Sequence, residues 1–303
     1  MLRGNTCGGL HRIENMIAYV LMKYKKSIAP LLLASTLLAS CASPTARMEV
    51  AERIAAPAYM IGREIAANPF LLTAFERMET RNMPATVYIE GDGLAYTGRY
   101  TPSLDPTPLN PVALSLATGD TGLNVVYLAR PCQYNKMVRD DAPCPVAYWT
   151  TKRFAPEVID SMNAALDEIK SRYGVTAFNL VGYSGGGAVA ALITAKREDV
   201  ASLRTVAADL DNTFFTRLHN VDDMPESLNA ADVAADIAHV PQRHFTGAKD
   251  KIVPASVFES YLARAGNTSC IRHNIVTDAS HDKGWAEKWP VLLQAPVGCT
   301  TEQ

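Results

Sequence analysis

The chain has 303 residues, with 29 Lys and Arg against 31 Asp and Glu, and a formal net charge of −2. Such a balance gives no basic surface for nucleic acid and no electrostatically held membrane partner. The part after residue 41 is long enough for one large domain and short for two.

The first forty residues include the layout of an export signal. Residues 22–26 form a basic head, residues 28–38 a short apolar run, and Leu38-Ala39-Ser40-Cys41 ends the segment. The apolar run is too short to span a bilayer comfortably, which is typical of a secretory signal at residues 22–40. Residues 1–21 are a mixed polar stretch that a signal does not need, so we expect translation to start at Met22.

The end of this signal resembles the lipobox of bacterial lipoproteins, in which small residues before a cysteine allow cleavage there. The resemblance implies that Cys41 carries lipid and anchors the protein in the membrane of the cell envelope. Ala42 after the cysteine resembles outer-membrane sorting, with the protein facing the periplasm. The alternative is an ordinary export signal with a chance cysteine. Residues 41–56 are alanine-rich, and we expect a tether that begins to form a helix, followed by one domain at residues 57–303.

Strand-like and helix-like segments alternate along this domain. The helical segment 154–173 repeats apolar residues about every four positions. We expect strands at residues 70–77, 85–90, 123–129, 177–181, 203–208, 243–246 and 271–276, and further helices at 188–196 and 255–264. This alternation predicts the α/β class, with a mainly parallel central sheet and helices on both faces.

One motif stands between the predicted strand 177–181 and the helix after it. Gly182-Tyr183-Ser184-Gly185-Gly186 matches G-x-S-x-G. In a strand–turn–helix setting, this motif holds a serine on a sharp, strained turn with its hydroxyl projecting above the sheet. Ser184 is therefore the candidate nucleophile, and a base and an acid should follow it.

Two later turns supply these partners. Asp250 follows the strand 243–246, and His281 follows the strand 271–276. Loops after parallel strands share the carboxyl edge of the sheet, so both should lie near Ser184. We expect His281 to exchange the proton of the serine and Asp250 to orient the imidazole. Asp209 and Asp211, after the strand 203–208, are competing positions for the acid.

A developing oxyanion needs two hydrogen-bond donors. The backbone N–H of Gly185 is one, and we expect the other from Asp92 or Gly93 in the turn Glu90-Gly91-Asp92-Gly93. Glu90 and Asp92 themselves are expected to order that turn. No cofactor is expected, and without clustered ligands we expect no metal site.

Of the six cysteines, Cys7 lies in the doubtful leader and Cys41 is the lipid candidate, which leaves an even set, Cys132, Cys144, Cys270 and Cys299. In an exported chain this predicts disulfides. Of the three possible pairings, we favour Cys132–Cys144 with Cys270–Cys299, because each joins segments close in sequence. A zinc site is the competing interpretation, but the spacing has no C-x-x-C pair.

Together, the elbow, the acid turn and the final histidine loop resemble the α/β-hydrolase superfamily, over residues 70–295. The resemblance implies a serine hydrolase, a bacterial lipoprotein member that cleaves small-molecule carboxylic esters through an acyl-enzyme on Ser184. One departure is the oxyanion turn, where family members often carry His-Gly-Gly-Gly or His-Gly. A peptidase or acyltransferase with the same triad, or a non-catalytic envelope lipoprotein on this scaffold, are the alternatives.

Three further regions concern the substrate pocket. The insert between Asp209 and Gln242 is long for a plain connection and predicts a small lid, with Phe214, Phe215 and Leu218 as its apolar residues. The proline-rich loop 101–111 is expected to shape the pocket. Around Tyr134, Tyr148 and Trp149, pocket-lining and packing roles are equally expected.

Overall fold

The computed structural model describes residues 44–134 and 144–300. The predicted leader, the signal and the lipidation site Cys41 lie outside the described residues. No helix among the described residues is both long and apolar enough to cross a membrane.

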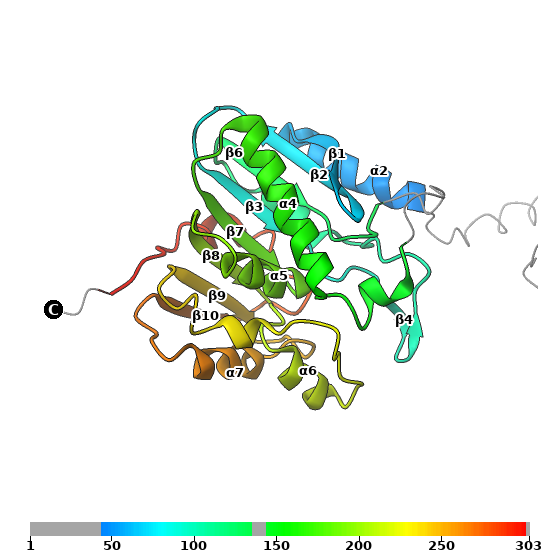
Figure 1. Ribbon diagram of the computed structural model, residues 1–303, viewed down its shortest axis with the longest axis vertical. Coiled ribbons are helices and arrows are strands. Elements are labelled where there is room, and N and C mark those ends of the chain that lie inside the picture. Colours follow the sequence, from blue (N-terminus) through cyan, green and yellow to red (C-terminus); the bar gives the residue numbers. More distant parts are fainter. Residues whose placement is uncertain (1–43, 135–143, 301–303) are drawn as a thin grey trace, which may run out of the picture. The chain divides into compact units, whose positions relative to one another are not determined.

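The core of the domain is an eight-stranded sheet (Figure 1). Its strands, in spatial order, are β1 (Ile61–Ala67), β2 (Phe70–Met78), β6 (Asn124–Leu128), β3 (Ala85–Ile89), β7 (Phe178–Tyr183), β8 (Val200–Val206), β9 (Gln242–Gly247) and β10 (Ile271–Val276). From β6 to β10 all neighbours are parallel, whereas β2 pairs antiparallel with both β1 and β6. The predicted α/β class with a mainly parallel sheet is confirmed.

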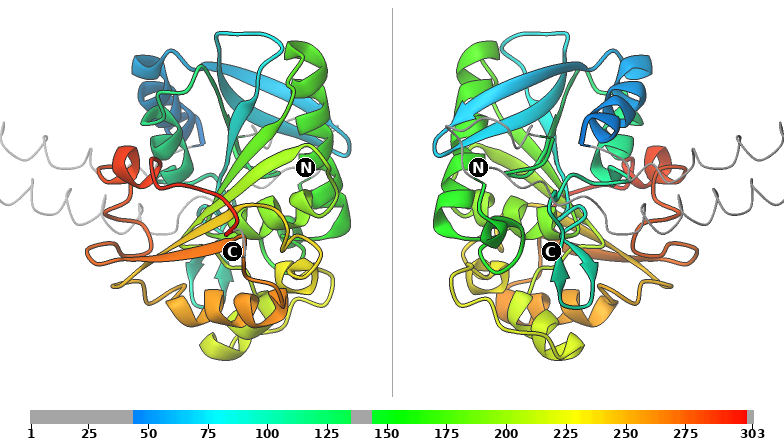
Figure 2. Two further views of the ribbon diagram at one scale, coloured as in Figure 1. Left: turned by 90° about the vertical axis from the view of Figure 1, so that its left-hand side faces the viewer. Right: turned by 90° about the vertical axis from the view of Figure 1, so that its right-hand side faces the viewer.

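Helices cover both faces of this sheet (Figure 2). On one face lie α4 (Pro156–Tyr173), α5 (Gly185–Thr194) and α7 (Ala255–Ala265), and on the other α2 (Pro44–Ala55), α3 (Val112–Thr118) and α8 (Trp289–Leu292). The interior strand β6 is buried along its whole length, as expected of a strand covered by helices on both faces. The apolar repeat of α4 is likewise buried.

The N-terminal part differs from the expected tether. Residues 44–55 form α2, whose Ala51 and Ala55 are buried in the core. Arg47 fixes this helix to the domain, because its Nη1 donates to the carbonyl of Thr107 at 2.8 Å. Strand β1 was not predicted, since its first four residues are exposed and only Ile65 and Ala67 are buried.

Two disulfides join Cys132 to Cys144 and Cys270 to Cys299. These are the local pairings that the spacing favoured. They close segments of 12 and 29 residues.

Other short elements complete the described chain. They are the hairpin β4 (Tyr96–Gly98) and β5 (Thr101–Pro102), the helix α6 (Asn212–His219), and the 3-10 turns η1 (Ala56–Ala58), η2 (Val146–Trp149) and η3 (Ala230–Val233). The predicted insert between β8 and β9 therefore contains α6 and η3.

Candidate active site

Ser184 stands at the sharp turn between β7 and α5. Its backbone has φ 51° and ψ −125°, a strained conformation for a residue with a side chain. The turn needs a glycine at Gly186, because a Cβ there would lie 2.3 Å from the carbonyl oxygen of Ile89. A backbone bond from the N–H of Ser184 to the carbonyl of Val206 (2.9 Å) ties the turn to strand β8. This is the geometry of a nucleophile elbow.

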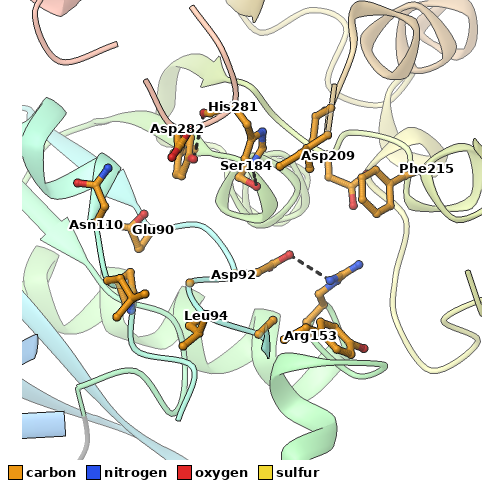
Figure 3. A pocket seen from close by; sticks show the side chains of 18 residues that line it. Glu90, Asp92, Leu94, Asn110, Arg153, Ser184, Asp209, Phe215, His281 and Asp282 are labelled. Carbon is orange, nitrogen blue, oxygen red and sulfur yellow. Dashed lines mark hydrogen bonds and ion pairs between the residues drawn. The ribbon is translucent and has the colours of Figure 1, made fainter. Parts of the chain in front are cut away.

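His281 approaches the serine from the loop after β10 (Figure 3). Its Nε2 lies 3.0 Å from Oγ of Ser184. Two hydrogen bonds to the backbone carbonyl of His281 hold the loop. They come from the hydroxyl of Tyr183 (3.1 Å) and from Nε1 of Trp285 (3.0 Å). The imidazole is therefore positioned by backbone contacts as well as by its partners.

Asp250 lies on the other side of the imidazole. Its Oδ2 is 3.0 Å from Nδ1 of His281, while Oδ1 accepts the N–H groups of Ile252 and Val253, each at 2.8 Å. A carboxylate accepts, so Nδ1 of His281 donates and Nε2 is left to accept the proton of Ser184. The side chain of Asp250 is fully buried, which keeps water from competing for this bond.

The competing acids have other surroundings. Asp211 caps α6, accepting from the N–H of Phe214 at 3.1 Å and from the hydroxyl of Ser260 at 2.6 Å. Asp209 follows β8 and lines the cavity described below. The structure thus brings Asp250, rather than Asp209 or Asp211, to His281.

The turn 90–93 meets the start of α5 beside the serine. A Cβ at Gly185 would lie 2.1 Å from Oδ1 of Asp92, and one at Gly91 would lie 3.1 Å from Cβ of Ser184. Gly93 has φ +64°, and a side chain there would collide with the carbonyl oxygen of Pro106. The three predicted oxyanion residues, Gly185, Asp92 and Gly93, are therefore gathered at the candidate nucleophile.

The carboxylate of Asp92 is held by two arginines. Its Oδ1 is 3.3 Å from Nη1 of Arg130, and its Oδ2 is 3.2 Å from Nη1 of Arg153 (Figure 3). Arg130 is buried and also donates to the backbone carbonyl of Arg153. Burial lowers the pKa of Arg130 to about 10, although the neighbouring Asp92 opposes this shift. Asp92 was predicted to order its turn, and Arg130 and Arg153 are the side chains that hold its carboxylate in place.

Two more acids near the serine are buried. Burial raises the pKa of Glu90 to about 7, against hydrogen bonds from the backbone of Gly91 and Ala113. Burial also raises the pKa of Asp209 to about 7, although the positive charge of Arg153 opposes the shift. Both carboxyl groups therefore exchange protons close to neutral pH.

A cavity of about 530 Å³ opens onto Ser184 and His281. Its size suits a small or medium ligand. The apolar part of its lining is formed by Leu94, Ala95, Tyr96, Pro108, Leu109, Phe215, Ile252 and Val253, and the polar part by Glu90, Asp92, Asn110, Arg153, Asp209 and Asp282.

Across the described ranges 44–134 and 144–300, no group of three or more His, Cys, Asp or Glu side chains could hold a metal ion.

The lining of the cavity bears on the regions expected to shape the pocket. The loop 101–111 does line the cavity, and from the insert Phe215 does so as well. The aromatic residues Tyr134, Tyr148 and Trp149 do not line it. Nε1 of Trp149 donates to the carbonyl of Ser103, and the other two rings pack against Tyr127 and Phe70. Arg130 and Arg153 were not predicted at all, because no sequence motif surrounds them.

No family profile matches this sequence, and no curated protein matches it. Solved structures do match. A serine hydrolase homologue of Coxiella burnetii is 15% identical and has a TM-score of 0.50, with 76% of this chain and 92% of that chain covered. An esterase of Pyrococcus furiosus is 13% identical and has a TM-score of 0.55, with 77% and 90% covered.

A third similar structure is the acylaminoacyl peptidase of Pyrococcus horikoshii, which is 12% identical and has a TM-score of 0.55. The match covers 76% of this chain and 39% of that longer chain. Across all three proteins, the likeness lies in the arrangement of strands and helices rather than in the sequence. The chain has the fold of the α/β-hydrolase superfamily.

Proposed function

We propose that the protein is a serine hydrolase that cleaves carboxylic esters of small or medium acids through an acyl-enzyme on Ser184. The observation that carries this proposal is the relay of two 3.0 Å contacts, from Ser184 to His281 and from His281 to Asp250. A neutral serine is a weak nucleophile, and this relay supplies a base that is itself oriented by an acid.

The proposed reaction has two halves. In the first, Oγ of Ser184 attacks the ester carbonyl while Nε2 of His281 takes the hydroxyl proton. The oxyanion is met by the backbone N–H group of Gly185 and by that of Asp92 or Gly93. When the tetrahedral intermediate collapses, the C–O bond to the alcohol breaks and His281 protonates the leaving oxygen.

In the second half, water replaces the alcohol. His281 removes a proton from the water, the resulting hydroxide adds to the acyl carbon, and the bond to Oγ of Ser184 breaks as the proton returns to the serine. Asp250 keeps its negative charge throughout and stabilises the imidazolium in both halves. The products are a carboxylic acid and an alcohol.

Peptide cleavage is the second candidate. It is favoured by the likeness to the acylaminoacyl peptidase, and it would pass through the same acyl-enzyme. Esterase activity is the simpler proposal, because the likeness to the Pyrococcus furiosus esterase extends over 90% of that chain, against 39% for the peptidase. Acyl transfer differs only in the group that attacks the acyl-enzyme.

We also propose that the enzyme works in the cell envelope, anchored by lipid on Cys41. The two disulfides support an oxidising compartment outside the cytoplasm, since disulfides persist there. Mass spectrometry of the mature N-terminus tests the anchor, with Cys41→Ala as the control that should release the protein from membranes. An unmodified Cys41 in membrane-bound protein would reject the lipid anchor.

A fluorophosphonate probe tests the catalytic proposal directly. The wild type should be labelled, Ser184→Ala should not, and Asp250→Asn should react about 10³- to 10⁴-fold more slowly. A panel of p-nitrophenyl esters from acetate to octanoate, run beside acyl-peptide substrates, then separates esterase from peptidase. Folded wild type that takes no label would reject the proposal and favour a non-catalytic scaffold.

A further inference from the structure

Among the described polar side chains that line the candidate cavity, Glu90, Arg153 and Asp209 each carry a buried atom without a hydrogen-bond partner. Glu90 is still bonded through its other oxygen, which accepts from the N–H group of Gly91 at 2.9 Å. Asp209 is 3% exposed, and its Oδ1 makes no hydrogen bond within the part of the chain that the structure describes. The same holds for Nε of Arg153. Both side chains line the cavity that contains Ser184 (Figure 3).

The triad does not account for Asp209. Its backbone N–H donates to the carbonyl of Ser184 at 3.2 Å, which fixes the residue beside the nucleophile. Its carboxyl group, however, is not the partner of His281, which bonds to Asp250. Two residues later, Asp211 shows what a structural carboxylate looks like here, since it bonds to the backbone of Phe214 and to other side chains. A buried carboxyl oxygen without such bonds is costly and calls for a function.

Arg153 is arranged to complement it. Its Nη1 is engaged by Asp92 at 3.2 Å, which leaves the Nε–H group as a donor. Its positive charge is also close enough to Asp209 to oppose the increase in the pKa of that carboxyl caused by burial. Thus an acceptor and a donor line the same cavity, and neither has a hydrogen-bond partner within the described residues.

The charges around this pair select the kind of group that fits. A carboxylate would suit Arg153 but would meet Asp209 as well as Glu90 and Asp282 on the cavity wall. An ammonium group would suit Asp209 but would approach the guanidinium of Arg153. A hydroxyl group satisfies both with one oxygen, because it donates to a carboxylate and accepts from an N–H group.

We propose that Asp209 and Arg153 form a subsite that binds an uncharged hydroxyl group of the substrate, in either its acyl or its alcohol part. The subsite rests on the proposed ester hydrolysis at Ser184 and makes Asp209 a specificity-determining residue. The substrates it favours are esters of hydroxy acids or of polyols.

Two pairs of esters test this subsite and distinguish the two parts of the substrate. The acyl pair is p-nitrophenyl 3-hydroxybutyrate against p-nitrophenyl butyrate, and the alcohol pair is glycerol monobutyrate against propyl butyrate. The readout is the ratio of kcat/KM within each pair, because a general loss of activity cancels in a ratio. One hydrogen bond to a charged group should favour the hydroxylated member by roughly 10- to 100-fold.

Asp209→Ala should abolish this preference in the pair where it occurs, and Asp209→Asn, which retains an oxygen acceptor, should keep part of it. Asp282→Asn is the matched control, since it removes another carboxylate of the cavity wall and should retain the ratio. Thermal unfolding of each variant checks that it is folded.

Wild type that hydrolyses both members of each pair equally would overturn the subsite and leave the esterase proposal standing. A preference that survives in Asp209→Ala, or that Asp282→Asn removes equally, would also overturn it. Wild type that neither turns over any ester nor takes the fluorophosphonate label would overturn both proposals.

Discussion

The two arginines that bind Asp92 lead to a prediction about both the stability of the fold and the activity of the enzyme. Asp92→Asn removes the negative charge shared by Arg130 and Arg153 and leaves the shape of the side chain almost unchanged. The side chain of Arg130 is only 4% exposed, so its charge cannot be solvated by water instead. At neutral pH the guanidinium stays protonated even with its lowered pKa of about 10, and it would be left as an unpaired buried charge.

Breaking a buried ion pair from one side typically costs about 3–5 kcal/mol. Asp92 is 19% exposed and its two contacts measure 3.2 and 3.3 Å, so the pair is not fully desolvated. The amide also keeps one acceptor oxygen. We therefore expect Asp92→Asn to lower the free energy of unfolding by about 2–3 kcal/mol.

Urea unfolding followed by circular dichroism measures this change. The matched control is Asp160→Asn, which breaks an exposed pair with Lys196, 60% and 45% exposed, and should cost below about 0.5 kcal/mol. Equal losses in the two variants would refute the assignment of a buried charge cluster.

The same variant should also impair the reaction. Asp92 lies against Gly185, and the second proposed oxyanion donor is the backbone N–H group of Asp92 itself or of the adjacent Gly93. Loss of such a donor costs about 100- to 1000-fold in kcat, so a misplaced one should cost roughly 10-fold or more. Full kcat in a destabilised Asp92→Asn protein would show that the arginines stabilise the fold without positioning the oxyanion turn.

Three further predictions follow from individual contacts. Gly185→Ala should fold but lose most esterase activity, measured as kcat/KM, because its Cβ would lie 2.1 Å from Oδ1 of the doubly held Asp92; an active variant would contradict this packing. Asp209→Asn should raise the free energy of unfolding by about 2–4 kcal/mol at pH 8 and by almost nothing near pH 4, because the folded carboxyl keeps its proton up to about pH 7 whereas the unfolded one loses it near pH 4. Unfolding curves of both proteins at the two pH values measure this, and a gain independent of pH would speak against a raised pKa. Replacing both cysteines of the Cys270–Cys299 disulfide, which closes 29 residues, should cost about 3–4 kcal/mol in urea unfolding, and an unchanged midpoint would show that it does not restrain the unfolded chain.

The strands of the parallel sheet could be predicted from sequence because burial on both faces makes them continuous apolar runs. Strands β6 and β7 are of this kind, with Val125 and Leu180 fully buried. Strand β1 lies at the sheet edge and exposes Ile61 and Arg63, so its sequence has neither an apolar run nor a clean alternation. The alanine-rich residues 44–55 resemble a tether in sequence, whereas the structure packs Ala51 and Ala55 of α2 into the core.

The positions of Ser184, Asp250 and His281 could be predicted for a different reason. Each lies in the turn or loop after a strand of the parallel region, and the topology of such a sheet brings these loops to one edge. No motif or strand end in the sequence indicates that Arg153 belongs to the site. It precedes α4 and reaches the site through the packing of that helix against the sheet.

The turn 90–93 illustrates the difference between residues that a motif identifies and residues that only the packing brings to the site. From sequence, the carboxylate of Asp92 is expected to order the turn, but the groups that bind it are unknown. The structure supplies two cations from distant segments, Arg130 and Arg153, and their guanidinium groups neutralise the carboxylate. Asp209 then remains as a buried carboxylate of the cavity without such partners. The residues of the proposed reaction thus lie in local motifs, whereas the polarity of the cavity depends on contacts between segments far apart in the chain.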